Sequence, residues 1–66
     1  MEIILNSKKI TVDDGMTLSR VLEQQGIAPT GIATAVNGAV VSRDKRDSYT
    51  LTQGDNIVII KAFYGG

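Results

Sequence analysis

The feature that most constrains the fold is the run Asn56-Ile57-Val58-Ile59-Ile60-Lys61, the most strand-like stretch of the sequence. Its four central positions are all apolar, and turn-forming residues precede it. An edge strand of this character would invite aggregation, because its unpaired backbone groups would template contact with other chains. We therefore expect residues 56–61 to form a central strand with a neighbour on each side.

The composition bounds the size of the domain and excludes several kinds of site. At 66 residues, of which 42% are apolar, the chain can form one domain with a compact core. It has no cysteine and no histidine, which excludes a disulfide framework, the usual zinc ligands and any catalytic serine–histidine or cysteine–histidine pair. Seven basic residues balance seven acidic ones, so no overall charge attracts nucleic acid or a membrane.

The localisation expected from the sequence is cytoplasmic. The first residues, Met1-Glu2-Ile3, lack the basic start and apolar stretch of a signal peptide. No apolar run approaches the length of a membrane span.

The N-terminal part of the chain predicts a hairpin. Two short β-rich runs, Glu2–Leu5 and Lys9–Val12, flank the turn-forming residues Asn6-Ser7-Lys8. The turn Asp13-Asp14-Gly15 follows, and Thr17 is then placed to cap the N-terminus of a helix.

The predicted helix has one apolar stripe and a clear end. Leu18, Val21 and Leu22 have the spacing of a single buried face. Gly26 ends the helix as the residue after its C-cap, and Pro29 prevents the helix from resuming. A helix of roughly nine residues is too short to persist alone, so it must pack on a sheet.

A second hairpin follows. The residues Asn37-Gly38 favour a type I′ turn between a strand at Ile32–Val36 and a return strand at Ala39–Val41. The pattern leaves open which face of the first of these strands points inward, because either its two alanines or its larger apolar residues could face the helix.

The polar segment Ser42–Ser48 is expected to be a surface connection, with room for a helical turn. A nucleic-acid site at Arg43–Asp47 is disfavoured, because two acids nearly cancel three bases and no aromatic residue is present to stack on a base. Neither Asp13-Asp14 nor the pair Asp44 and Asp47 has the spacing of a calcium loop. The sequence therefore predicts a solvated turn here, no metal site, and no catalytic centre anywhere in the chain.

The order of hairpin, helix, hairpin and final strand predicts an α+β fold of the β-grasp (ubiquitin-like) type. This is a mixed sheet of four to five strands with one main helix packed on one face. Ile57 and Ile59 would face the helix, whereas Val58 and Ile60 would emerge on the uncovered face; a shift of one residue would exchange the two faces. Because a small domain that displays such a face usually uses it on a partner, we expect Val58 and Ile60, with Phe63, to form a partner-docking patch.

The chain ends in Phe63-Tyr64-Gly65-Gly66 (residues 63–66), just after the predicted central strand. Glycines offer no side chain to a core, and unanchored termini usually fray. Four extended residues reach at most about 13–14 Å, enough to carry the Gly66 carboxylate into another protein's cleft. We therefore predict a single domain, residues 1–66, whose last four residues form a flexible tail that threads into a narrow site. An incidental floppy end is the alternative.

Several short segments, in this order and spacing, carry a resemblance to known proteins: Met1-Glu2-Ile3-Ile4-Leu5-Asn6, Thr17-Leu18-x-x-Val21-Leu22, Ala35-Val36-Asn37-Gly38, Gly54-Asp55-x-Ile57-x-Ile59 and Gly65-Gly66. With the short length and the β-grasp order, they resemble the ubiquitin-like sulfur carrier proteins of the ThiS/MoaD-like family, most closely those of thiamine biosynthesis. Tyr64 departs from the pattern, which would have a smaller residue such as alanine or glycine there.

The resemblance implies a sulfur carrier rather than an enzyme. An E1-like, ThiF-like partner would use ATP and magnesium to adenylate the Gly66 carboxylate. A persulfide donor would then displace AMP to leave a thiocarboxylate, whose sulfur enters thiazole formation on a ThiG-like thiazole synthase. In this scheme the carrier binds no cofactor itself and is a monomer when free.

Other functions remain open from the sequence. Within the same chemistry, the chain could be the small subunit of molybdopterin synthase or a carrier for another sulfur metabolite. A different class is a ubiquitin-like modifier joined to target lysines through Gly66. A β-grasp interaction or RNA-binding module with an incidental tail is disfavoured by the neutral charge and by the position of Gly-Gly at the very end.

Overall fold

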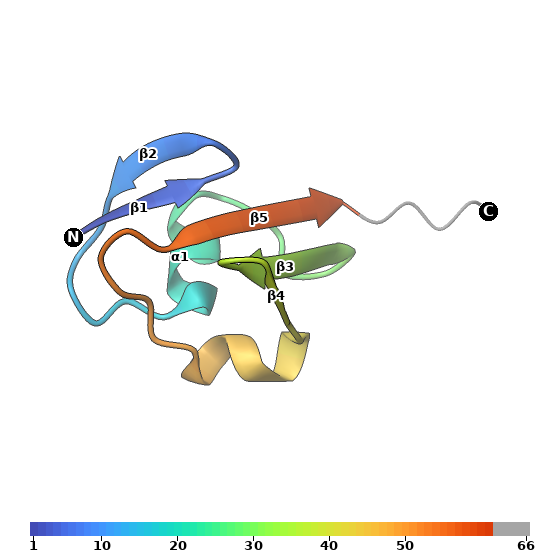
Figure 1. The fold of residues 1–66 in the computed structure, drawn as a ribbon. Coiled ribbons are helices and arrows are strands. Elements are labelled where there is room, and N and C mark those ends of the chain that lie inside the picture. Colours follow the sequence, from blue (N-terminus) through green and yellow to red (C-terminus); the bar gives the residue numbers. More distant parts are fainter. Residues whose placement is uncertain (62–66) are drawn as a thin grey trace.

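The computed structural model describes residues 1–61. Figure 1 shows one sheet with the helix α1 across one face and the strand β5 running through the middle. The elements in chain order are β1 Glu2–Leu5, β2 Lys8–Thr11, α1 Leu18–Gln24, β3 Ile32–Val36, β4 Ala39–Val41, the 3₁₀ helix η1 Arg43–Ser48 and β5 Asn56–Lys61.

The sheet has five strands in the order β2-β1-β5-β3-β4. The central strand β5 runs parallel to β1 and antiparallel to β3, so the sheet is mixed. The predicted α+β, β-grasp fold is therefore confirmed, as is the central position of residues 56–61. A central apolar strand has hydrogen-bonded neighbours on both sides, which removes the edge that would otherwise promote aggregation.

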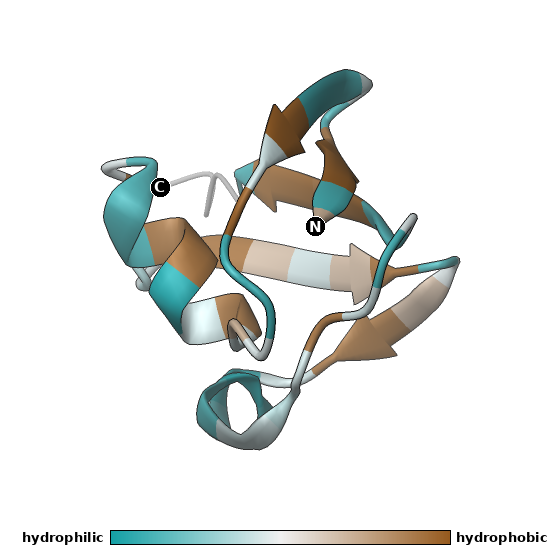
Figure 2. Cartoon of the chain, turned by 90° about the vertical axis from the view of Figure 1, so that its left-hand side faces the viewer, coloured by the Kyte–Doolittle hydropathy of each residue, from teal (hydrophilic) through white to brown (hydrophobic). Residues whose placement is uncertain are grey.

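The core lies between α1 and the inner face of the sheet. Figure 2 shows the hydrophobic side of α1 turned toward the strands and its hydrophilic side turned outward. The predicted stripe is confirmed, because Leu18, Val21 and Leu22 are all buried. Burying one such side chain contributes about 1.5–3 kcal/mol, which is how a helix of seven residues becomes stable here. The other buried hydrophobic residues are Ile3, Leu5, Val12, Met16, Val36, Val41, Leu51 and Ile57.

Both ends of α1 are capped as predicted. The Thr17 Oγ1 accepts a hydrogen bond from the Arg20 backbone N–H at 3.3 Å. At the other end, Gly26 has φ +71° and its N–H donates to the Glu23 carbonyl, while the Ile27 N–H donates to the Leu22 carbonyl. This pair of bonds is a Schellman motif, which needs the left-handed backbone that glycine adopts without strain.

Two-residue turns close both hairpins. Asn37 and Gly38 have φ of 52° and 83°, as the predicted type I′ turn requires. Asn6 and Ser7 also have positive φ, 48° and 69°, so the first turn uses only these two residues. The second strand therefore runs over Lys8–Thr11, and the predicted range, one residue later, was wrong.

The structure decides which face of β3 points inward. Thr34 and Val36 are each 1% exposed and lie on the core side, whereas Ala33 is exposed and lies on the opposite face. The buried Thr34 hydroxyl donates a hydrogen bond to the Val41 carbonyl at 2.8 Å. The core tolerates the polar side chain of Thr34 because its hydroxyl group is hydrogen-bonded within the core.

The prediction that the segment 43–47 is simply a solvated turn was wrong for Arg46, which is only 4% exposed. Its guanidinium donates three hydrogen bonds, from Nε to the Thr34 Oγ1 at 3.2 Å, from Nη1 to the Pro29 carbonyl at 2.9 Å and from Nη2 to the Ile32 carbonyl at 3.0 Å. Arg46 therefore ties η1 to β3 and to the loop before it. Net charge along the sequence could not reveal this, because the acceptors are backbone carbonyls and a hydroxyl of distant residues.

Candidate functional site

The strand β5 presents alternate side chains to the two faces of the sheet. Ile57 is fully buried and Ile59 packs partly buried against the core. Val58 and Ile60 are 39% and 60% exposed and lie on the face away from α1. The predicted orientation of the strand is confirmed, and the two residues assigned to the docking patch share one open face.

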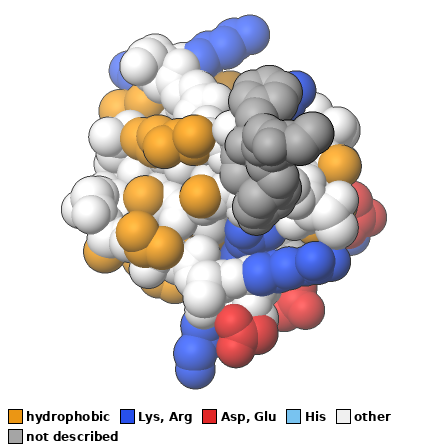
Figure 3. All heavy atoms as spheres, turned by 90° about the vertical axis from the view of Figure 1, so that its right-hand side faces the viewer, with side chains coloured by type: hydrophobic (Ala, Val, Ile, Leu, Met, Phe, Trp, Pro, Cys, Tyr) orange, Lys and Arg blue, Asp and Glu red, His pale blue; other side chains and the backbone are white. Residues whose placement is uncertain are grey.

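These two residues belong to a larger apolar surface, which we call the sheet-face patch. Cross-strand pairing places Ala35 between Val58 and Val40, and Ala33 beside Ile60. In Figure 3 hydrophobic side chains gather on the left, the side that the open face of the sheet occupies. The sheet-face patch comprises Ile4, Ala33, Ala35, Val40, Val58 and Ile60.

Sequence reasoning missed Val40, which at 81% is the most exposed large hydrophobic residue among those described. Its place follows from its pairing with Ala35 across the hairpin, which puts both side chains on the open face. Side chains alternate between the two faces along residues 39–41, but which face Val40 takes depends on the orientation of β3, its partner strand. That orientation could not be derived from sequence.

The predicted tail falls outside the described part of the chain. The statements about Phe63, Tyr64, Gly65 and Gly66, including the role of Phe63 in docking and the flexibility of residues 63–66, stay predictions. The last described residue is Lys61, which still pairs with Ile32 of β3. The strand that carries Val58 and Ile60 is therefore held in the sheet up to the point where the tail begins.

A buried carboxylate, Asp55, organises the start of β5. It is 7% exposed and accepts hydrogen bonds from the Thr52 N–H at 2.8 Å, the Thr52 hydroxyl at 3.0 Å and the Asn37 side-chain amide at 2.9 Å. Burial by itself raises the pKa of Asp55, but these hydrogen bonds outweigh it and hold the pKa below its ordinary value. The Asn37 Oδ1 also accepts from the Asn56 N–H at 2.9 Å, so the network joins the hairpin turn to β5.

On the other side of β5, Asn6 extends a short parallel ladder. Strand β1 pairs with β5 only at Ile4 and Leu5. Beyond them the Asn6 N–H donates to the Ile57 carbonyl at 2.9 Å, and the Asn6 Oδ1 accepts from the Ile59 N–H at 2.8 Å. Asn6 thus takes the place of a further paired residue of β1 and helps to hold the orientation of β5, which bears Val58 and Ile60.

Two further observations concern the residues described. Within residues 1–61 no cluster of three or more histidine, cysteine, aspartate or glutamate residues could hold a metal ion. In the same part of the chain, no helix has the length and apolar character needed to cross a membrane.

Comparison with known proteins places the chain in a family. The family model that matches is the ThiS family, over residues 1–66. The Sulfur carrier protein ThiS of Escherichia coli (strain K12) is 29% identical over 66 residues, which are 100% of both chains.

Two solved structures from Geobacter metallireducens are similar over the whole chain. The crystal structure of its thiamine biosynthesis protein (ThiS) has a TM-score of 0.84 and 28% identity, covering 100% of this chain and 99% of that one. The NMR solution structure of a thiamine biosynthesis protein from the same organism has a TM-score of 0.77 and 26% identity, covering 100% and 88%. The family match, which spans the whole sequence with its two terminal glycines, and this agreement in fold lead to one conclusion: the chain belongs to the ThiS family.

Proposed function

We propose that this protein is a sulfur carrier of thiamine biosynthesis and that the C-terminal carboxylate of Gly66 carries the sulfur. The observation that carries the proposal is the family match over residues 1–66, which includes Gly65 and Gly66. The full-length relative from Escherichia coli is named a sulfur carrier protein, and the Geobacter metallireducens structures are named thiamine biosynthesis proteins.

The chemistry begins with activation, because a carboxylate is a poor electrophile. A ThiF-like adenylating enzyme supplies the ATP and Mg²⁺ site. An oxygen of the Gly66 carboxylate attacks the α-phosphorus of ATP, which forms the acyl-adenylate and releases pyrophosphate. The terminal sulfur of a persulfide donor then attacks the acyl carbon and AMP leaves. A thiol cleaves the resulting acyl disulfide, which frees the thiocarboxylate and leaves a disulfide as the other product.

In this scheme the chain is a co-substrate of its partners rather than an enzyme, and it needs no cofactor of its own. The sheet-face patch docks the adenylating enzyme and then a ThiG-like thiazole synthase, to which the thiocarboxylate delivers sulfur. Phe63, Tyr64 and Gly65 thread into each active site, where a β-carbon at Gly65 or Gly66 would crowd the channel. The absence of cysteine fits this role, because no side-chain thiol of the carrier competes for the sulfur.

Mass spectrometry tests the proposal after incubation of the full chain with a ThiF-like enzyme, ATP, Mg²⁺, a persulfide donor and a thiol that cleaves the acyl disulfide. We expect a gain equal to the exchange of one oxygen for one sulfur. A larger covalent adduct on another protein would indicate a ubiquitin-like modifier instead, and an unchanged mass would contradict both.

A second readout separates thiamine biosynthesis from molybdopterin synthesis and from other sulfur pathways. The thiocarboxylated chain is incubated with a thiazole synthase and its other substrates. Formation of the thiazole, with the carrier returned to its original mass, supports the proposal. Failure with this enzyme but sulfur transfer to a molybdopterin precursor would reassign the pathway.

A further inference from the structure

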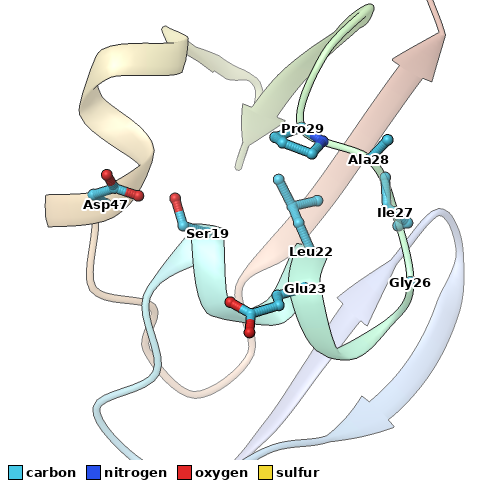
Figure 4. A pocket seen from close by; sticks show the side chains of 8 residues that line it. All are labelled: Ser19, Leu22, Glu23, Gly26, Ile27, Ala28, Pro29 and Asp47. Atoms are coloured by element: carbon cyan, nitrogen blue, oxygen red, sulfur yellow. The ribbon is translucent and has the colours of Figure 1, made fainter.

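A pocket of about 480 Å³ opens on the α1 side of the molecule, away from the sheet-face patch. It lies between α1, the loop that joins α1 to β3, and η1 (Figure 4). Its apolar part is formed by Leu22, Ile27, Ala28 and Pro29, and two acidic side chains, Glu23 and Asp47, complete its wall.

The walls of this pocket are held in place by contacts already present. The Schellman motif at Gly26 fixes the turn that presents Ile27 at the end of α1. The Arg46 Nη1 donates to the Pro29 carbonyl at 2.9 Å, which anchors the far side of the loop and places the adjacent Asp47 on η1 beside it. A preformed pocket loses little conformational entropy when it is filled.

The two acids that line the pocket favour a cation, and the Arg46 guanidinium, which is bonded to the Pro29 carbonyl of the wall, is already engaged by that carbonyl, the Ile32 carbonyl and the Thr34 hydroxyl. Both charged residues that line the pocket are acids, and Figure 4 shows them on two different elements, Glu23 on α1 and Asp47 on η1. The last turn of α1, which forms this wall, carries no basic residue to offset the partial negative charge at the C-terminus of the helix. The Arg20 guanidinium lies 3.4 Å from the Glu23 carboxylate, but both side chains are largely exposed, and such a pair is easily exchanged.

We propose that this pocket binds the side chain of an arginine or lysine presented by a protein partner. The alkyl stem would pack on Ile27, Ala28 and Pro29, and the cationic head would meet the carboxylates of Glu23 and Asp47. Long basic side chains combine these two characters, an apolar stem and a charged tip. The proposal does not depend on the sulfur chemistry, and the pocket shares no residue with the sheet-face patch.

The test uses three capped tripeptides as probes, acetyl-Gly-Arg-Gly-amide, its lysine analogue and its citrulline analogue. Citrulline has nearly the shape of arginine without the charge. Titrated into the ¹⁵N-labelled full chain, the arginine and lysine peptides are expected to shift the amide signals of Ser19, Glu23, Ile27 and Asp47 saturably. Equal shifts with the citrulline peptide, or shifts spread over the acids outside the pocket, would overturn the proposal.

Matched variants sharpen the result. Glu23→Gln and Asp47→Asn are each expected to weaken binding of the arginine peptide about threefold, the size of an exposed ion pair. Asp44→Asn changes an exposed acid of the same element η1 that does not line the pocket, and is expected to leave binding unchanged. Equal effects of Asp44→Asn and Asp47→Asn, or none from either pocket variant, would refute the site. Thiocarboxylation at Gly66 is measured separately, so failure of one proposal does not imply failure of the other.

Discussion

Single polar side chains complete backbone hydrogen bonding where the strands of this small sheet run out. Arg46 caps the Ile32 carbonyl, which lies beyond the last β3–β4 pair, Thr34 with Val41. Asn6 accepts from the Ile59 N–H beyond the end of β1. A buried backbone group without a partner costs free energy, so each of these side chains stabilises the fold out of proportion to its size.

The hydrogen bonds of the Asp55 carboxylate make part of the stability depend on pH. Its pKa is lower in the folded protein than its ordinary value of 3.8, because hydrogen bonds from Thr52 and Asn37 stabilise the charged form. The stabilisation is therefore fully present only above about pH 5, a pH unit above the ordinary pKa, and it is lost as the pH falls through the lowered pKa of the folded protein. Asp55→Asn is expected to reduce the free energy of unfolding at pH 7 by about 1–3 kcal/mol. The new side-chain NH₂ would face hydrogen-bond donors of Thr52 and Asn37, where a carboxylate oxygen now accepts.

Urea unfolding of Asp55→Asn and the parent chain, measured from pH 7 to pH 2, checks this prediction. We expect the difference in stability between the two proteins to narrow toward the acid end. A constant difference across the range would show that the ionised form of Asp55 is not what stabilises the fold. Asp44→Asn, at an exposed carboxylate, serves as the control.

At the scale of elements, the two faces of β5 differ in burial, and recognition is proposed only for the exposed one. The inner face supplies Ile57, at 0% exposure, to the core, whereas the outer face supplies Val58 and Ile60 to the sheet-face patch. A change on one face should therefore act mainly on folding, and a change on the other mainly on binding.

Charging the outer face tests this division. Both Ile60→Lys and Ile60→Glu are expected to weaken binding to the adenylating enzyme, because either charge would be buried without a partner in the interface. Their cost in stability should be about 1 kcal/mol or less, the range of strand propensities at an exposed site. Ile57→Ala, on the inner face, is expected to lose about 2–5 kcal/mol of stability.

Calorimetric titration against the adenylating enzyme and urea unfolding of each variant provide the two measurements. Unaffected binding in both Ile60 variants would remove the patch from the docking surface. Opposite effects of the two charges would show that the contact is electrostatic rather than apolar.

At the scale of the whole molecule, one strand carries two residues of the sheet-face patch and runs to the end of the described chain. β5 has neighbours on both sides, β1 and β3, and is paired up to Lys61. Val58 and Ile60 of the sheet-face patch and Lys61, the last described residue, therefore belong to one paired strand. If the proposed docking holds, a partner bound to the patch also fixes the position of Lys61.

Deleting Gly66 separates the domain from its proposed chemistry. The buried hydrophobic residues named above all lie within residues 1–61, and glycine has no side chain to bury, so we expect the thermal midpoint to stay within about 2 °C, the shift expected from a few tenths of a kcal/mol. Activation, measured as ATP-dependent pyrophosphate release with the adenylating enzyme, is expected to be lost. A fall in stability comparable to that of Ile57→Ala would contradict the prediction of an independent tail.

The sequence by itself determined the elements, their order and the family resemblance. Asn37-Gly38, the cap at Thr17 and the ending at Gly26 act on neighbouring residues, so their effects can be derived from local chemistry. The apolar run 56–61 called for a central strand, and that requirement, with the helix stripe, predicted the β-grasp fold and the outward orientation of Val58 and Ile60.

Only the tertiary structure decided the inward face of β3, the burial of Arg46, the network of Asp55 and the acid-walled pocket beside α1. Each of these joins residues more than ten positions apart in the chain. Their contacts form when the helix, η1 and the hairpins pack together, and no spacing along the sequence encodes the distance between such residues. Arg46 is the clearest example, because its charge predicts solvent exposure and its hydrogen-bond acceptors, supplied by residues 29–34, bury it.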